Sequence, residues 1–144
     1  MKVKFKKLLA NARMPTYATD GAGCFDLYAA DLESCGSTKQ AVYDTGLAIQ
    51  VPKGYTMLVF SRSGHGFKKS LRLANCVGVI DSDYTGPVKI KLQADGKHAP
   101  ILDMQDAVAQ ALIIATPSIM FEQVQELDAT ERGAGGFGST DKKA

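Results

Sequence analysis

The stretch Thr85-Gly86-Pro87-Val88-Lys89-Ile90-Lys91-Leu92-Gln93-Ala94-Asp95-Gly96 decides the fold class. Its apolar residues at positions 88, 90 and 92 alternate with polar residues at 89, 91 and 93, and turn-forming glycines stand at both ends. A two-residue period puts one set of side chains on each face of a half-buried β-strand. The stretch therefore predicts a strand bounded by two turns.

Similar short runs recur along the chain, separated by glycine-containing turns. Alternation around Val3 and Phe5, and the runs 55–60 and 119–124, predict further strands. Residues 103–115 fit a helix by composition, but the paired isoleucines and the stop at Pro117 favour a strand. Residues 64–69 are predicted to hold a short helical turn. Many short strands without a repeat or linker indicate one all-β domain, a sandwich or a barrel.

Composition narrows the class of protein. The chain has 144 residues, of which 45% are hydrophobic and 22% charged, and its formal net charge is +2. This balance suits one globular domain and argues against a general nucleic-acid or anionic-membrane binder. No apolar run approaches the roughly 20 residues of a membrane helix, and residues 1–7 lack the apolar core of a signal peptide. We therefore expect a cytoplasmic protein with neither nucleic acid nor membrane as partner.

Cysteine and histidine usage argues against a structural metal site. The three cysteines, Cys24, Cys35 and Cys76, form no C-x-x-C pair, and His65 and His98 stand far apart in sequence. A disulfide framework or a zinc site is not expected from such spacing. The cysteines are expected to be reduced and mostly buried.

The glycine-rich segment 132–140 is a candidate phosphate binder. It matches G-x-G-x-x-G, but the few residues that follow leave no room for the helix of a dinucleotide site, and a serine stands where a Walker A loop has lysine. Its closely spaced backbone N–H groups and hydroxyls can still wrap phosphates, with charge from Arg132 and a ring face from Phe137. The alternative is a mobile tail without a role.

Three further clusters carry chemistry. Arg62-Ser63-Gly64 offers a guanidinium, a hydroxyl and an amide to a polyanion, or it is only a charged turn. Asp81 and Asp83 would point to one side of an extended segment, and one of them could activate water; the alternative is an Asx-type turn. Asp26 is either bonded by backbone donors or directed at a cation. Together with the tail, these clusters suit phosphoanhydride chemistry on a nucleotide.

In five motifs, in order, the chain resembles the trimeric dUTPase family (dUTP diphosphatases). The resemblance spans nearly the whole chain, and although each motif alone is weak, five in order are specific. The matching segments are residues 21–30, 62–64, 75–86, 108–110 and 132–140.

The resemblance implies a jelly-roll-like all-β subunit, with a body at 1–131 and a flexible arm at 132–144 that completes the site. It also implies a homotrimer with active sites at subunit interfaces. The implied reaction is Mg²⁺-dependent cleavage of dUTP to dUMP and pyrophosphate, which limits uracil incorporation into DNA.

By the same resemblance, Asp81 deprotonates the water that attacks the α-phosphorus, and Asp26 holds Mg²⁺ through its waters. Tyr84 packs beneath the deoxyribose, where a 2′-hydroxyl would clash. The remaining residues implied to bind substrate are Arg62, Ser63, Gly64 and Gln110 on the phosphates, Asn75 and the hairpin backbone from Val79 and Ile80 to Lys89 on the uracil, and, from the arm, Phe137 over the uracil with Arg132, Gly138, Ser139 and Thr140 over the phosphates.

The chain departs from the family pattern at Cys24, at Ser61, at Ala107 in place of a usual arginine, and at Asp141. Two alternatives share the fold: a dCTP deaminase-related enzyme and a nucleotide-sensing regulatory protein. Such deaminases use a glutamate in the hairpin region, whereas no glutamate occurs here between Glu33 and Glu122. A purely structural jelly-roll protein would bind no nucleotide at all.

Overall fold

The alternating stretch at residues 88–93 forms strand β9 (Pro87–Ala94) in a computed structural model that describes residues 1–37, 39–96 and 101–139. Val88, Ile90 and Leu92 are 2%, 2% and 1% exposed, whereas Lys89 and Lys91 face solvent. Opposite faces of the strand thus meet opposite environments, as a two-residue period requires. The predicted strand is confirmed.

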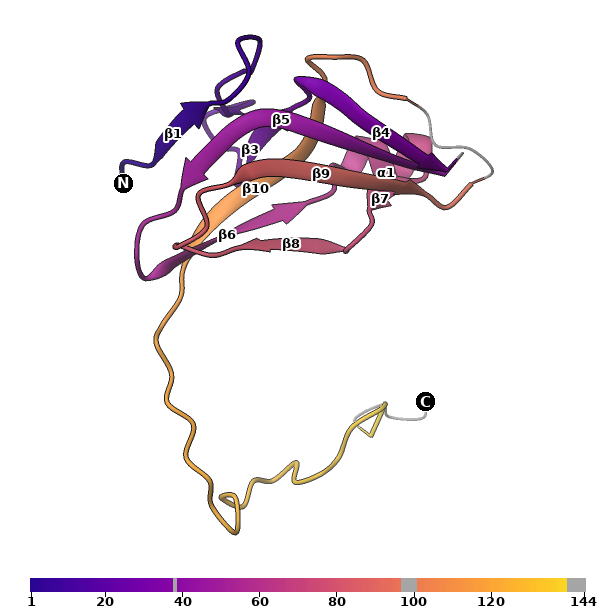
Figure 1. Cartoon of the computed structure of the whole chain (residues 1–144). Coiled ribbons are helices and arrows are strands. Elements are labelled where there is room, and N and C mark those ends of the chain that lie inside the picture. Colours follow the sequence, from indigo (N-terminus) through magenta and orange to yellow (C-terminus); the bar gives the residue numbers. More distant parts are fainter. Residues whose placement is uncertain (38, 97–100, 140–144) are drawn as a thin grey trace.

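Two antiparallel sheets pack face to face around the core (Figure 1). The first sheet has the order β1 (Lys4–Lys7), β5 (Gln40–Gln50), β9 and β7 (Leu71–Leu73), with β4 (Asp31–Ser37) also paired to β5. The second has the order β2 (Thr16–Tyr17), β3 (Phe25–Tyr28), β10 (Ala107–Ala115), β6 (Tyr55–Phe60) and β8 (Val77–Ile80). The helix α1 (Ser63–Lys69) confirms the predicted helical turn. The all-β, jelly-roll-like prediction is confirmed, as is a strand within 103–115.

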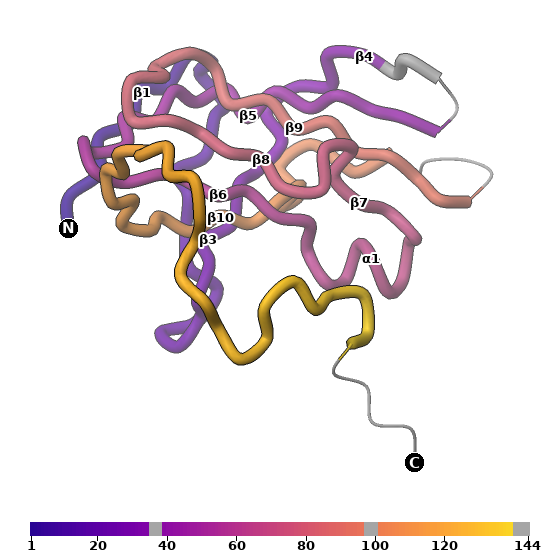
Figure 2. The backbone as a smooth tube through the Cα atoms, turned by 90° about the horizontal axis from the view of Figure 1, so that it is seen from below, coloured from indigo at the N-terminus to yellow at the C-terminus, as the bar shows by residue number. Residues whose placement is uncertain are grey.

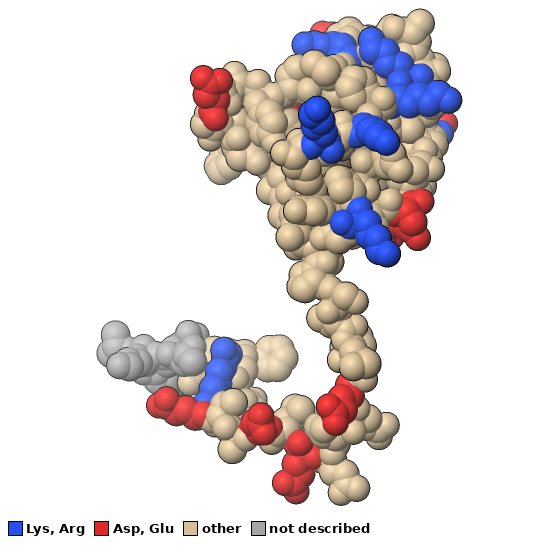
Figure 3. Space-filling model, turned by 90° about the vertical axis from the view of Figure 1, so that its left-hand side faces the viewer, with Lys and Arg blue, Asp and Glu red and all other residues tan. Residues whose placement is uncertain are grey.

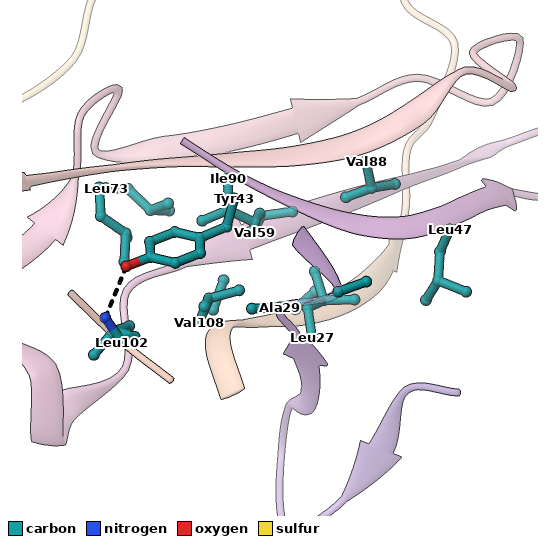
Figure 4. Packing of buried hydrophobic residues seen from close by; sticks show 14 of the residues in the cluster. Leu27, Ala29, Tyr43, Leu47, Val59, Leu73, Val88, Ile90, Leu102 and Val108 are labelled. Atoms are coloured by element: carbon teal, nitrogen blue, oxygen red, sulfur yellow. Dashed lines mark hydrogen bonds between the residues drawn. The ribbon is translucent and has the colours of Figure 1, made fainter. Parts of the chain in front are cut away.

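The core fills the space between the two sheets (Figure 4). Leu27, Tyr43 and Leu47 are fully buried. Complete burial of one such side chain stabilises the fold by about 1.5–3 kcal/mol. The Tyr43 hydroxyl accepts a hydrogen bond from the Leu102 backbone N–H at 2.8 Å, so burial leaves this polar group satisfied. The bond also fixes the loop that leads into β10.

The strand predicted at residues 119–124 is wrong for the single chain. After β10 the backbone leaves the body, and described residues 116–139 contain no helix or strand. Ile119, Met120 and Phe121 are 69%, 95% and 91% exposed. A strand needs a neighbouring edge for its backbone hydrogen bonds, and this segment runs away from both sheets (Figure 1). Seen from below, the same segment lies in front of the body (Figure 2).

The expectation of mostly buried cysteines is wrong at Cys76, which is exposed in the turn before β8, while Cys24 is half-buried. Cys76 has a φ of 62°, so it occupies a left-handed turn position on the surface. The side chain of Cys35, and His98, lie outside the described residues. No helix in the described part of the chain is long and apolar enough to cross a membrane.

Candidate active site

A pocket of about 710 Å³ opens beside the connection between β8 and β9. β8 is a terminal strand of the second sheet, whereas β9 belongs to the first, so this connection crosses from one sheet to the other. Among the described residues no strand pairs with the outer edge of β8, so backbone donors and acceptors lie open there. The residues of the implied site that line this pocket are Asn75, Val79, Ile80, Asp81, Tyr84 and Lys89.

The turn between the two strands fixes Tyr84 at this pocket. Its N–H donates to the Asp81 carbonyl at 3.2 Å, and its hydroxyl donates to the Pro87 carbonyl at 2.9 Å. A Cβ at Gly86 would lie 2.7 Å from the Tyr84 hydroxyl oxygen, so only glycine leaves room for the ring. Residues 81–84 therefore form a backbone turn, and the expectation that Asp81 and Asp83 share one side of an extended segment is wrong.

Lys89 contributes its backbone rather than its ammonium group to the pocket. Its side chain projects from the outer face of β9 and forms an ion pair with Glu33 of β4. The hydrogen bond to the Glu33 carboxylate raises the pKa of Lys89. The part of Lys89 that can meet a base edge is therefore its main chain.

A second cluster of predicted residues lies at the other end of the second sheet. Arg62 donates to both Asp26 carboxylate oxygens, at 3.0 and 3.3 Å, and its third contact is the Ala107 carbonyl at 3.5 Å. Gln110 lies opposite Asp26 in the β3–β10 ladder and donates to the Ser61 carbonyl at 3.0 Å. Ser63 and Gly64 follow, exposed at the start of α1.

His65 is a residue of this cluster that sequence reasoning did not assign. It is 7% exposed, and its Nδ1 is buried without a hydrogen-bond partner among the described residues. Burial lowers its pKa, and the charges of Arg62 and Lys69 lower it further, against smaller opposing effects of Asp106 and Asp26. The His65 backbone N–H donates to the Arg62 carbonyl at 3.1 Å, which ties the buried imidazole to the Arg62 loop. A lone histidine in a glycine-containing turn gives no sequence signal for this.

A single chain does not join the two clusters. In the β6–β8 ladder Met57 lies opposite Ile80 and Phe60 opposite Val77. Asp81 follows one end of the ladder and Arg62 the other. The two residues are thus separated by more than about 10 Å along the strands.

The tail residues form a third part, apart from both clusters (Figure 1). Phe137 is fully exposed with a φ of 50°, and the Arg132 guanidinium donates to the Gly135 carbonyl at 2.7 Å. The N–H of Ser139 donates to the Gly136 carbonyl, and Gly138 has a φ of 87°. Thr140 lies outside the described residues.

The acidic residues suit a hydrated magnesium ion better than a closed protein cage. Among the described residues, no three His, Cys, Asp or Glu side chains gather to hold a metal. Mg²⁺ usually keeps several waters and binds one or two carboxylates together with substrate phosphates. Asp26, beside the guanidinium of Arg62, fits the role of one such carboxylate.

Comparison with known proteins points to one family. A family model described as dUTPase matches residues 10–141. The deoxyuridine 5'-triphosphate nucleotidohydrolase of Nautilia profundicola is 39% identical over 142 residues, covering 99% of this chain and 100% of that protein. A mutant dUTPase of Staphylococcus bacteriophage 80alpha, bound to dUpNHpp, is similar with a TM-score of 0.84 at 26% identity, covering 96% and 98% of the two chains. A mutant dUTPase of S. aureus phage phi11, which coordinates a structural Mg(II) ion, shares the fold with a TM-score of 0.77 at 22% identity, covering 90% and 100%.

Proposed function

Since the chain belongs to the dUTPase family, we propose that it is a dUTP diphosphatase that hydrolyses dUTP to dUMP and pyrophosphate. The observation that carries this proposal is the pocket between the sheets, where an unpaired backbone edge, Tyr84 and the Asp81 carboxylate meet. This activity would limit uracil incorporation into DNA and supply dUMP.

The pocket suits the recognition of a deoxyuridine nucleotide. Backbone groups of β8 and the side chain of Asn75 form hydrogen bonds with the uracil edge. Cytosine exchanges a donor for an acceptor at that edge, which leaves buried groups unpaired and costs about 1–3 kcal/mol for each. The methyl group of thymine is excluded by contact with the backbone. Tyr84, held by its bond to Pro87, packs beneath the deoxyribose and excludes a 2′-hydroxyl.

The reaction is an attack of water on the α-phosphorus. Asp81 orients the water and accepts its proton; the new bond joins the water oxygen to the α-phosphorus, and the bond to the α,β-bridging oxygen breaks to release pyrophosphate. Arg62, Ser63, Gly64 and Gln110 hold the phosphates. Mg²⁺, for which Asp26 is the carboxylate, would supply charge neutralisation on the phosphate oxygens.

A homotrimer is part of the proposal, because the parts of the site are separated in one chain. Asp81 and Arg62 lie at opposite ends of the β6–β8 ladder. A site with both groups therefore needs Asp81 from one copy and Arg62 from another. The arm supplies the third part: Phe137 over the uracil, and Arg132, Gly138, Ser139 and Thr140 over the phosphates.

The exposed segment 118–128 and an apolar groove suggest how copies associate. The groove, of about 420 Å³, lies beside the open edge of β1. It is lined by Met1, Val3, Phe5, Met14, Pro15, Tyr17, Phe25, Ile49 and Ile113. Basic side chains gather on the face that carries β1, and acidic side chains on the tail (Figure 3). We place Ile119 and Phe121 of a neighbouring copy in this groove, which would bury them and give their backbone an edge to pair with.

The proposal is tested by pyrophosphate release from dUTP, dCTP, dTTP and UTP, each with Mg²⁺ and with a chelator. We expect Mg²⁺-dependent release from dUTP alone, and light scattering at the mass of three chains. Ammonia released from dCTP would support the deaminase alternative instead. Binding of dUTP without release from any nucleotide would favour the sensor alternative and overturn the enzyme assignment.

A further inference from the structure

The loop before β2 holds an arginine to which neither the motifs nor the proposed chemistry give a role. The Cζ atom of Arg13 lies 3.8 Å from the ring centroid of Tyr28, and its Nη1 donates to the Gln105 carbonyl at 3.1 Å. The Tyr28 hydroxyl is hydrogen bonded to the Thr16 hydroxyl at 2.6 Å, which fixes the ring. An arginine stacked on a fixed aromatic ring presents its remaining N–H groups in a defined direction.

The loop that carries Arg13 is itself anchored. Asn11 donates through its side-chain amide to the Ala30 carbonyl at 2.8 Å, and the Gln105 side chain donates to the Asn11 carbonyl at 3.1 Å. The Gln105 N–H donates to the Ala29 carbonyl at 2.8 Å. The loop that carries Arg13 is therefore held by the segment that follows β3 and by the turn that precedes β10.

Arg13 lies on the same face of the second sheet as the Asp26 cluster. Tyr28 and Asp26 are two residues apart on β3, so their side chains share a face at a spacing of about 7 Å. Opposite them on β10 lie Ala107 and Gln110. Arg62 donates to the Ala107 carbonyl at 3.5 Å, and Arg13 lies on the ring of Tyr28, which is the residue opposite Ala107. Ala107, where the family usually has arginine, contributes no guanidinium of its own at this position.

The two guanidinium groups differ in their charge balance. Asp26 neutralises Arg62, whereas Arg13 has no carboxylate partner within the described ranges, where the ion pairs join Arg62 to Asp26, Arg72 to Asp95 and Lys89 to Glu33. An oriented guanidinium without a counter-charge beside a polyphosphate site favours phosphate oxygens, which it can bind with two N–H groups at once.

We propose that Arg13, held on the ring of Tyr28, is a second guanidinium of the polyphosphate-binding face and binds the outer phosphates of the nucleotide. The inference rests on the proposed function, since it deepens the same site. It assigns to Arg13 a contact that dUTP makes and dUMP lacks.

The test compares the affinities of dUpNHpp and dUMP for full-length variants by calorimetry. We expect Arg13→Gln to weaken dUpNHpp binding about threefold to tenfold and to leave dUMP binding unchanged, because one charge-assisted contact to phosphate is lost. Arg13→Lys should recover part of the loss, because it keeps the charge without the planar fork. Tyr28→Leu keeps the arginine but removes its platform, and should also weaken dUpNHpp selectively.

Arg72→Gln is the matched control, because Arg72 is a similarly exposed arginine paired with Asp95 in the other sheet. It should change neither affinity. If Arg13→Gln lowers the affinities for dUpNHpp and dUMP equally, or lowers neither, the role of Arg13 is overturned. The proposed function still stands in that case, provided that the wild-type protein binds the ligands. Absence of wild-type binding to either ligand would overturn the proposed function and this inference together.

Discussion

The absence of a side chain at position 86 keeps the ring of Tyr84 in place. A Cβ there would lie 2.7 Å from the Tyr84 oxygen, so Gly86→Ala must displace the ring and break its bond to Pro87. We expect the KM for dUTP to rise about tenfold, the equivalent of one lost hydrogen bond with its packing. Steady-state kinetics measures this. Gly96→Ala is the control, because a Cβ at Gly96 meets no atom within 4 Å. Equal kinetics of the two variants would contradict the assigned packing.

Asp81 is assigned the proton of the attacking water. Asp81→Asn should therefore lower kcat by about 10²- to 10⁴-fold, as expected for loss of a general base, while dUpNHpp still binds. Asp83→Asn, in the same turn, should retain most of the activity. Single-turnover kinetics and calorimetry separate chemistry from binding. Retention of wild-type kcat by Asp81→Asn would remove Asp81 from the mechanism.

His65 gives the fold a dependence on pH. Its pKa in the folded protein lies below its ordinary value of 6.5, chiefly because of burial. The unfolded chain therefore binds a proton more readily, and this contribution to stability, complete above about pH 6.5, is lost as the pH falls. His65→Leu also removes the unpartnered Nδ1. We expect its melting temperature to fall less between pH 7 and pH 5 than that of the wild type. Parallel melting curves would show that His65 is solvated.

At the scale of elements, side-chain alternation predicted the strands around Val3 and Phe5 and at residues 88–93, and both find a partner strand within the chain. It succeeded for residues 88–93, because the other sheet covers their apolar face. The strand predicted at residues 119–124 depended on apolar, β-favouring residues rather than on alternation. Such composition reports the preference of a segment and not the presence of an edge. Sequence pattern likewise did not predict the turn at Asp81. The turn is closed by the hydrogen bond from the Tyr84 N–H to the Asp81 carbonyl, and residue types alone do not indicate that bond.

The contents of the two clusters were predictable from motifs, but their separation was not. The order of motifs along the chain does not indicate how the strands pair. It is the antiparallel pairing of β6 with β8 that puts Asp81 and Arg62 at opposite ends of one ladder. Likewise, the stacking of Arg13 on Tyr28 depends on a loop anchored through Gln105 and Asn11, and nothing in the sequence pattern indicates it.

The arm provides a prediction at the scale of a segment. A chain that ends at Glu131 keeps both sheets and the whole core, so its melting temperature should be close to that of the wild type. Its kcat for dUTP should fall at least about tenfold, because water is no longer excluded from the phosphates. Calorimetric melting and pyrophosphate release measure the two effects. Unfolding of the truncated chain would show that the arm belongs to the body.

At the scale of the whole molecule, the separation of Asp81 from Arg62 leads to a complementation experiment. Asp81→Asn and Arg62→Gln should each be nearly inactive as homotrimers. If a site takes Asp81 from one copy and Arg62 from the next, mixed trimers contain sites in which both residues are wild type. Random assembly of equal amounts in a closed ring gives about one such site in four.

Co-refolding of the two variants should therefore restore about a quarter of the wild-type pyrophosphate release, whereas mixing the folded trimers without exchange should restore none. Co-refolding either variant with itself is the control for recovery of folded protein. If the co-refolded mixture stays as inactive as the separate variants, both residues must act from the same copy. Asp81 and Arg62 of one copy could then meet only if the second sheet rearranged. The hydrogen-bonded register of β6 with β8 and β10 opposes such a rearrangement.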